Sequence, residues 1–208
     1  MSKHMLGVAL RETRGPLKDL TDKLCGADGK AWLEALKRFL RKENPWARTW
    51  AVWKKIKLGT GLRTTEDFNK ALFKVRNCLI GPRAGSLMDA PSFTTNEEEE
   101  EVGLVVVSLS DLGFEKETKY SDICKRAQKL GLDLCPAEVG PQLRLQFTDQ
   151  LRGFLLIGMK PIILKSLDEP CVFLLGRNSA GWLAFDAADV GPDVLCSPGD
   201  RWVFLLRN

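Results

Sequence analysis

The sequence predicts an α+β protein: a helical N-terminal region followed by a mainly antiparallel sheet, or small open barrel, with one packed helix. Three observations support this class. Apolar residues recur at helical spacing through the first third of the chain. From Leu143 onward the apolar period falls to two. Strand-length runs then follow one another without helices between them, which indicates antiparallel pairing because parallel strands need long crossovers.

Two helices are expected before residue 45. The first follows Pro16, a residue suited to a first helical turn, and ends at Gly26. The second begins after Asp28 and ends at Asn44-Pro45, with a cationic last turn that compensates the helix dipole. Its apolar positions repeat at helical spacing and are Trp32, Leu33, Leu36, Phe39 and Leu40.

In the next segment, residues 46–59, the spacing of apolar residues is partly helical and partly strand-like. Trp46 to Gly59 is expected to be a helical turn that runs into a short strand. Thr64, followed three residues later by Asp67, predicts a capping box that opens another helix. Past Cys78 the pattern dissolves into Gly- and Pro-rich sequence, which indicates an exposed connector.

Five glutamates at residues 97–101 extend that connector as a solvated acidic run. We therefore expect a basic, mainly helical region over residues 1–95 and an α+β sheet domain over residues 96–208. In the second region, the β-branched run 102–109 predicts a strand and residues 120–130 predict a helix. Later strands are expected at 143–147, 154–159, 171–175, 182–185 and 202–206, with a five-residue hairpin connection at 177–181.

The net charge of +4 conceals a split along the chain. Residues 1–90 carry 19 Lys and Arg against 9 Asp and Glu, whereas residues 91–208 carry 12 against 18. A basic region favours nucleic acid, an anionic surface or an acidic partner. The alternative is that the basic half pairs with the acidic half of the same chain.

Composition excludes several classes of protein. With 44% hydrophobic residues the chain has enough apolar material to fold, yet no apolar run approaches the ~20 residues of a membrane span. The start of the sequence lacks a secretion signal. Six scattered cysteines without a C-x-x-C pair, and one histidine, speak against a zinc cluster and favour reduced thiols. We expect a cytoplasmic protein without a cofactor or a membrane partner.

Two segments carry a resemblance: LDLCPAEVGPQLRLQ at residues 132–146 and WKKIKLGTGL at residues 53–62. Both are similar to segments of a group of bacterial proteins of unknown function. The resemblance extends from about Trp32 to the last residues, apart from the atypical stretch 75–90. It implies a bacterial soluble protein and assigns no functional residues.

Most catalytic motifs are missing. The one histidine, His4, lies in a terminal segment, which argues against a His-dependent nucleophile. There is no G-x-S-x-G, P-loop or G-x-G-x-x-G pattern. Four aspartates near the last strands could gather around a divalent cation, although turn chemistry explains the same spacing: Asp186, Asp189, Asp193 and Asp200.

One polar cluster is dense enough to be a site. Glu138, Gln142 and Arg144 follow Cys135 in a stretch that two prolines and a glycine hold in an irregular shape. Arg144 could hold a carboxylate or phosphate in a bidentate manner, and Glu138 could assist a reaction. The alternative is that Glu138 and Arg144 pair with each other and pin the loop to the sheet.

A second cluster interleaves tryptophans with cations. Bases stack on aromatic faces and phosphates pair with Lys and Arg, so this composition suits single-stranded nucleic acid. Core tryptophans beside solvated lysines would explain the same letters. The residues are Trp46, Arg48, Trp50, Trp53, Lys54, Lys55 and Lys57.

The sequence therefore favours a non-enzymatic binding module that engages nucleic acid or an acidic protein partner through its basic N-terminal half. Its candidate binding residues are Trp50, Trp53, Lys54, Lys55, Lys57, Gln142 and Arg144. An enzyme of unknown reaction, with a carboxylate and arginine site in the loop 135–144, is the alternative. A structural or toxin-neutralising partner protein is a third possibility.

Overall fold

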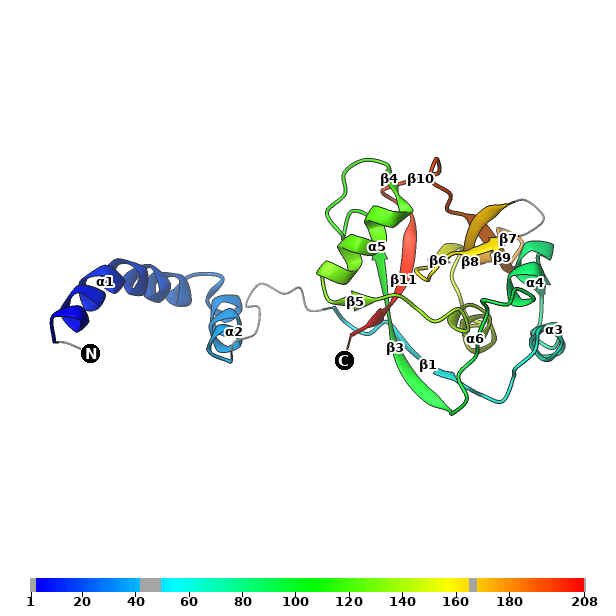
Figure 1. Cartoon of the computed structure of the whole chain (residues 1–208), viewed down its shortest axis with the longest axis horizontal. Helices are drawn as coiled ribbons and strands as arrows, with labels where there is room; N and C mark the ends of the chain where they lie inside the picture. The colour runs from blue at the N-terminus through cyan, green and yellow to red at the C-terminus, as the bar shows by residue number, and fades with distance from the viewer. Residues whose placement is uncertain (1–2, 42–49, 165–167, 208) are drawn as a thin grey trace. The chain divides into compact units, whose positions relative to one another are not determined.

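A computed structural model describes residues 3–41, 50–164 and 168–207, with side chains from Thr13 onward. The chain divides into two compact units, Met1–Arg48 and Thr49–Asn208. The division at residue 48 replaces the one expected near residue 95, because the strand and helices between these positions pair and pack with the later sheet. Figure 1 shows the two units.

The first unit is a pair of helices, α1 (Lys3–Cys25) and α2 (Gly29–Leu40). Both helices were expected, but Pro16 lies inside α1 instead of in its first turn. The short link between them is closed by a hydrogen bond from the Gly29 N–H to the Gly26 carbonyl (3.0 Å). The Lys23 ammonium lies over the Trp32 ring, 4.5 Å from its centroid, and so connects the two helices.

The second unit is built on a nine-stranded sheet in the order β1-β3-β11-β6-β8-β9-β2, with β5 paired to β11 and β7 to β8. A separate pair of short strands, β4 and β10, lies off this sheet. The bounds are β1 Lys54–Leu58, β2 Cys78–Ile80, β3 Glu100–Ser108, β4 Thr118–Lys119, β5 Leu132–Asp133, β6 Gly153–Ile157, β7 Ile162–Leu164, β8 Glu169–Arg177, β9 Leu183–Asp189, β10 Leu195–Cys196 and β11 Arg201–Leu206.

The sheet is mixed, so the α+β class is confirmed but the mainly antiparallel description is only partly met. β11 runs parallel to β6, and β2 runs parallel to β9. The other pairs are antiparallel, including the long β8–β9 hairpin across the predicted connection at 177–181. β11 inserts between β3 and β6, two strands that are distant in sequence.

Four helices cover this sheet: α3 (Thr65–Phe73), α4 (Pro82–Met88), α5 (Tyr120–Lys129) and α6 (Val139–Gln146). The predicted capping box of α3 is present, with the Thr64 side chain accepting from the Asp67 N–H (3.1 Å). Figure 1 shows α5 beside β3 and β11, and α3, α4 and α6 together at the other end of the unit.

Two expectations about local structure are wrong. The supposed connector contains α4, whose residues Ala84, Leu87 and Met88 are buried, because tertiary packing compensates for its weak local pattern. Residues 143–146 belong to the helix α6 instead of a strand. α6 is buried on nearly every side, so its apolar positions carry no helical period. Trp46 and Arg48 lie outside the described residues.

One apolar core joins the sheet to its helices. Phe173 on β8 stacks on Phe185 of β9, with ring centroids 5.1 Å apart. Tyr120 of α5 stacks on Trp202 of β11 at 4.9 Å. Among the helices that the structure describes, none combines the length and hydropathy needed to cross a membrane.

Candidate functional site

Glu138, at the start of α6, is fully buried and holds three separate segments together. One carboxylate oxygen accepts from the Gly59 N–H (2.8 Å) and from the Gln142 amide (3.0 Å). The other accepts from the Asn96 N–H (2.7 Å). Because carboxylate oxygens only accept hydrogen bonds, these donors occupy both of them. Glu138 therefore fixes the turn after β1 and the segment before β3.

The same face of α6 continues this network. Gln142 and Gln146 follow Glu138 at intervals of four residues, which aligns them along the helix. The Gln142 amide also donates to the Thr60 hydroxyl (2.7 Å). The Gln146 amide accepts from the Lys57 N–H (2.8 Å) and donates to the Lys57 carbonyl (2.7 Å). This row of side chains ties α6 to β1.

Arg144 belongs to a different group of contacts from Glu138. Its guanidinium is fully buried and donates from Nη1 to the Gln150 side chain (2.8 Å). Its Nε and Nη2 atoms are buried without a hydrogen-bond partner. Burial lowers the pKa of Arg144 to about 10, so the side chain keeps its charge at neutral pH. The sequence therefore singled out two residues that do not act as a pair.

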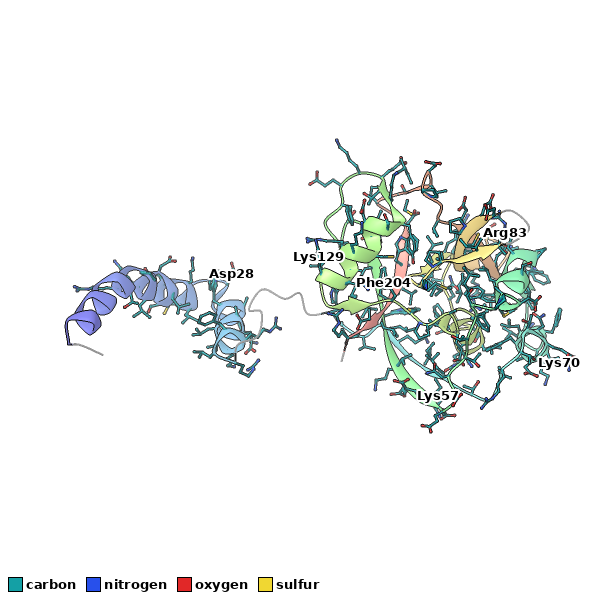
Figure 2. The ribbon with its side chains drawn as sticks, in the orientation of Figure 1. Asp28, Lys57, Lys70, Arg83, Lys129 and Phe204 are labelled. Carbon is teal, nitrogen blue, oxygen red and sulfur yellow. The ribbon has the colours of Figure 1, made fainter. Side chains whose placement is uncertain are left out.

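The three lysines of β1 each meet a carboxylate from elsewhere in the second unit. Lys55 pairs with Glu101 (2.8 Å) and Lys57 with Glu99 (2.7 Å), across the β1–β3 ladder. These hydrogen bonds raise the pKa values of both lysines and lower that of Glu101. Lys54 lies 4.0 Å from a carboxylate oxygen of Asp149. Figure 2 shows Lys57 at the outer end of the β1–β3 pair.

The tryptophans of this segment contact the rest of the unit. Trp50 donates from its indole nitrogen to the Leu130 carbonyl (2.9 Å). Trp53 packs edge-on against Phe147, with ring centroids 4.9 Å apart, and both tryptophans pack against the core. Trp53 also lines a pocket of about 310 Å³ together with Arg152 and Arg201. Packing against the core thus occupies much of the ring surfaces of Trp50 and Trp53.

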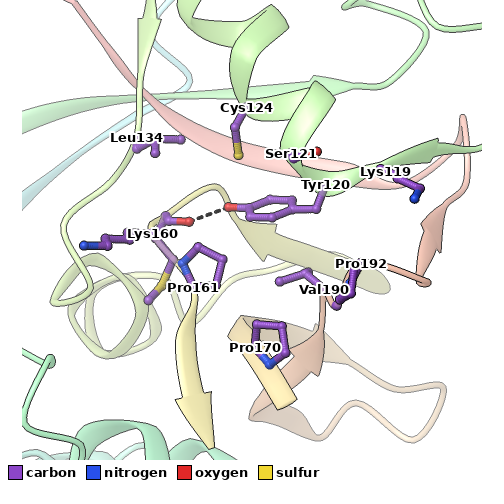
Figure 3. Close-up of a pocket in the computed structure, with 12 residues that line it drawn as sticks. Lys119, Tyr120, Ser121, Cys124, Leu134, Lys160, Pro161, Pro170, Val190 and Pro192 are labelled. Atoms are coloured by element: carbon purple, nitrogen blue, oxygen red, sulfur yellow. Dashed lines mark hydrogen bonds between the residues drawn. The ribbon is translucent and has the colours of Figure 1, made fainter. Parts of the chain in front are cut away.

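An apolar pocket of about 470 Å³ lies between α5 and the loops after β6 and β9 (Figure 3). Tyr120 and Cys124 line it from the helix, Pro161 and Val190 from the loops, and Pro170 from the start of β8. The Tyr120 hydroxyl donates to the Met159 carbonyl (2.5 Å), and burial raises its pKa above the ordinary value. The hydroxyl of Tyr120 therefore already donates its hydrogen bond within the protein.

Two of the four aspartates near the last strands stabilise turns. Asp189 accepts from the Gly191 N–H (2.7 Å), and Asp200 accepts from the Ser197 N–H (2.7 Å). Across the described residues, no group of three or more His, Cys, Asp or Glu side chains is placed to hold a metal ion. All six cysteines are free, and burial is the leading cause that raises the pKa of Cys78, Cys124, Cys135, Cys171 and Cys196. Such thiols are poor nucleophiles.

A basic pocket of about 580 Å³, which we call the Arg177 pocket, was missed by sequence reasoning. Lys74, Arg76 and Asn77 line it from the segment after α3, Thr148 from the loop after α6, and Arg177 from the end of β8. These segments are far apart in the chain. No motif in the sequence around Lys74, Arg76 or Arg177 indicated a site.

The first unit exposes much of the apolar stripe that the sequence placed on its second helix. Leu33, Phe39 and Leu40 of α2 are 43%, 65% and 71% exposed, and Leu17 of α1 is 57% exposed. Within the side chains described for this unit, Ala35 is the one buried hydrophobic residue. The helix pair therefore lacks a core of its own in the described part.

The chain was compared with family models, with curated proteins and with solved structures. None of the three comparisons found a match.

Proposed function

We propose that the protein is a non-enzymatic binding module that engages an acidic protein partner through the helix pair of its first unit. The observation that carries this proposal is the exposed apolar stripe of α2. Leu33 and Leu40 lie two helical turns apart, and Phe39 lies beside Leu40. An amphipathic helix that binds a hydrophobic groove presents its anchors at this spacing.

Covering the exposed apolar stripe of α2 by a partner would be energetically favourable. Covering one large apolar side chain contributes roughly 1.5–3 kcal/mol, and aromatic and leucine side chains are the usual anchors of helix-in-groove interfaces. A unit of this size buries a smaller share of its surface than a larger domain does, and so gains less stability from a core of its own. A partner that covers Leu33, Phe39 and Leu40 would supply the missing contacts.

The charge of the first unit favours an acidic partner. Residues 1–48 carry 11 Lys and Arg against 6 Asp and Glu, a net of +5, whereas residues 49–208 carry 20 against 21, a net of −1. The charge excess thus belongs to the helices, because the lysines of β1 are offset by Glu99 and Glu101. Two copies of the positive unit would repel each other, while an acidic surface would attract it.

A photo-crosslinking amino acid in place of Phe39 tests this proposal in the full chain. We expect it to form an adduct with an acidic protein in the cells that make the chain. The same group in place of Phe73, which is 76% exposed on α3, is the matched control and should not form that adduct. With the purified partner, Phe39→Glu should weaken binding by about tenfold or more, and Phe73→Glu should leave it unchanged.

Three outcomes would contradict the proposal. Adducts within the same chain would mean that the second unit covers the stripe. Adducts between two copies would mean self-association. An adduct with nucleic acid would mean that the basic N-terminal half binds nucleic acid instead of an acidic protein.

Nucleic-acid binding through β1 is less favoured and has its own test. Because Trp50 and Trp53 pack against the core and Lys55 and Lys57 are paired, tryptophan fluorescence of the full chain should not change with single-stranded or duplex oligonucleotides. The titration is made at low and moderate salt. Salt-sensitive quenching that is lost in a Lys54→Glu, Lys55→Glu variant would show that this segment binds nucleic acid.

Catalysis at the loop 135–144 is also less favoured. A general base needs a free carboxylate oxygen within reach of a substrate proton. Both oxygens of Glu138 accept hydrogen bonds inside the protein, and its side chain is fully buried. The arrangement supports a positioning role for Glu138 in the fold.

A further inference from the structure

The buried guanidinium of Arg144 has no carboxylate within ion-pair distance among the described residues, and the charge of Asp149 acts on it only from farther away. A guanidinium has five N–H donors, and a buried one is normally paired with a carboxylate or another acceptor group. Nη1 of Arg144 donates a hydrogen bond to the neutral side chain of Gln150, whereas Nε and Nη2 have no hydrogen-bond partner. None of the ion pairs among the described residues includes it. An uncompensated buried charge is strongly unfavourable, so the protein gains when an anion is nearby.

A second arginine lies in the same group of contacts. Arg177 donates from Nη1 to the backbone carbonyl of Gln150 (3.0 Å), while the Gln150 side chain accepts from Arg144. The two positive charges act on each other unfavourably, since Arg177 lowers the pKa of Arg144. Gln150 itself is fixed by donating to the carbonyls of Gly153 (3.3 Å) and Leu175 (3.2 Å). Gln150 therefore holds two like charges together without neutralising either.

These charges lie beside a cavity that is large enough for a small molecule. Arg177 lines the Arg177 pocket with Lys74 and Arg76, and none of the described lining residues is Asp or Glu. Arg144 does not line the pocket but is joined to it through Gln150, whose side chain accepts from Arg144 and whose backbone carbonyl accepts from the lining residue Arg177. The cavity of about 580 Å³ is within the range of small-molecule sites.

The wall of the pocket is held in place by backbone contacts. The Asn77 carbonyl accepts from the Leu183 N–H (2.8 Å), and Asn77 has a φ of 56°. Asparagine tolerates this left-handed conformation better than most residues. The Thr148 and Asn77 side chains add neutral polar groups to the cations, and Leu183 adds an apolar surface.

We propose that the Arg177 pocket binds a small molecule that carries a phosphate group. Three lining cations and a fourth buried beside them favour a doubly charged anion over a single carboxylate. The forked guanidinium of Arg177 suits the tetrahedral oxygens of phosphate, and Arg76 and Lys74 add charge at the exposed side. The organic part of the molecule would lie against Leu183. This site lies in the second unit and is independent of the partner proposed for the first.

Calorimetric titration of the full chain, in a low-salt buffer without phosphate, tests the proposal. The probes are glycerol 3-phosphate, inorganic phosphate, sulfate and succinate. We expect saturable one-to-one binding of glycerol 3-phosphate that is tighter than that of sulfate or succinate. Succinate binding more tightly would overturn the phosphate class. Equal binding of sulfate and glycerol 3-phosphate would mean an adventitious ion only.

Charge-removing variants locate the site. Arg177→Gln should weaken glycerol 3-phosphate binding by roughly 10- to 100-fold. Arg76→Gln should weaken it as well, and because Arg76 is exposed this variant keeps the fold. The control Lys116→Gln removes one exposed charge outside the pocket and should leave binding unchanged.

The variant Arg144→Met tests the contribution of the buried charge separately from that of the cations that line the pocket. Glycerol 3-phosphate should raise the unfolding temperature of the natural protein and raise that of Arg144→Met much less. The proposal fails if no probe gives saturable binding. It also fails if Arg177→Gln and Arg76→Gln bind glycerol 3-phosphate as the control does.

Discussion

Replacing Glu138 with alanine is expected to destabilise the second unit by about 3–5 kcal/mol. The side chain is fully buried, and its two oxygens accept three hydrogen bonds. Alanine would leave the N–H groups of Gly59 and Asn96 without acceptors and open a cavity beside α6. An unsatisfied buried donor costs about 1–3 kcal/mol, and the cavity adds to that loss.

Urea unfolding followed by circular dichroism measures this change. Glu97→Ala is the matched control, because Glu97 is exposed and lies next to Asn96 in the chain. A surface glutamate of this kind should change the free energy of unfolding by less than about 0.5 kcal/mol. If the two variants unfolded at the same urea concentration, the carboxylate of Glu138 would have no part in holding the three segments together.

Gly140→Ala is expected to destabilise the same region by about 2–3 kcal/mol, through overpacking instead of lost hydrogen bonds. A Cβ atom at Gly140 would lie 2.4 Å from Cδ2 and 2.8 Å from Cβ of Phe173. Phe173 cannot move aside easily, since its ring stacks on Phe185 and meets Phe93 edge-on. The added methyl group must therefore push α6 away from β8.

Gly85→Ala is the matched control, because Gly85 is also helical but a Cβ atom there meets nothing within 4 Å. Alanine is the better helix former, so this variant should stabilise the protein by up to about 1 kcal/mol. Thermal unfolding compares the two substitutions directly. A stabilising Gly140→Ala would show that α6 and Phe173 are not in close contact.

Local patterns predicted the elements whose caps and periods are strong. α3 was found through Thr64 and Asp67, and α5 through its apolar face and Gly131. α6 could not be found in this way, because residues 139–144 are all buried. Its polar and apolar residues therefore do not alternate with a helical period. β1 was expected as a strand, but its partner β3 is distant in sequence, so the boundary at residue 48 was not visible.

The candidate site was predicted in part. Glu138 and Gln142 are indeed clustered, but the partners of Glu138 include backbone N–H groups from other segments, which no side-chain pattern can reveal. The pairing of Lys55 with Glu101 depends on strand register and was likewise hidden. The Arg177 pocket combines several chain segments, so its charge cluster exists only in three dimensions.

The place of β11 in the sheet has a consequence for synthesis of the chain. β11 lies between β3 and β6 and also pairs with β5, yet the ribosome makes it after every other strand described here. Until it emerges, the edge that β11 covers stays unpaired over five residues of β3, Leu104 to Ser108, and over Leu156 and Ile157 of β6. Such open edges invite aggregation during translation. A nascent chain released before Arg201 would therefore be a substrate for chaperones or proteases, even when its other strands have formed.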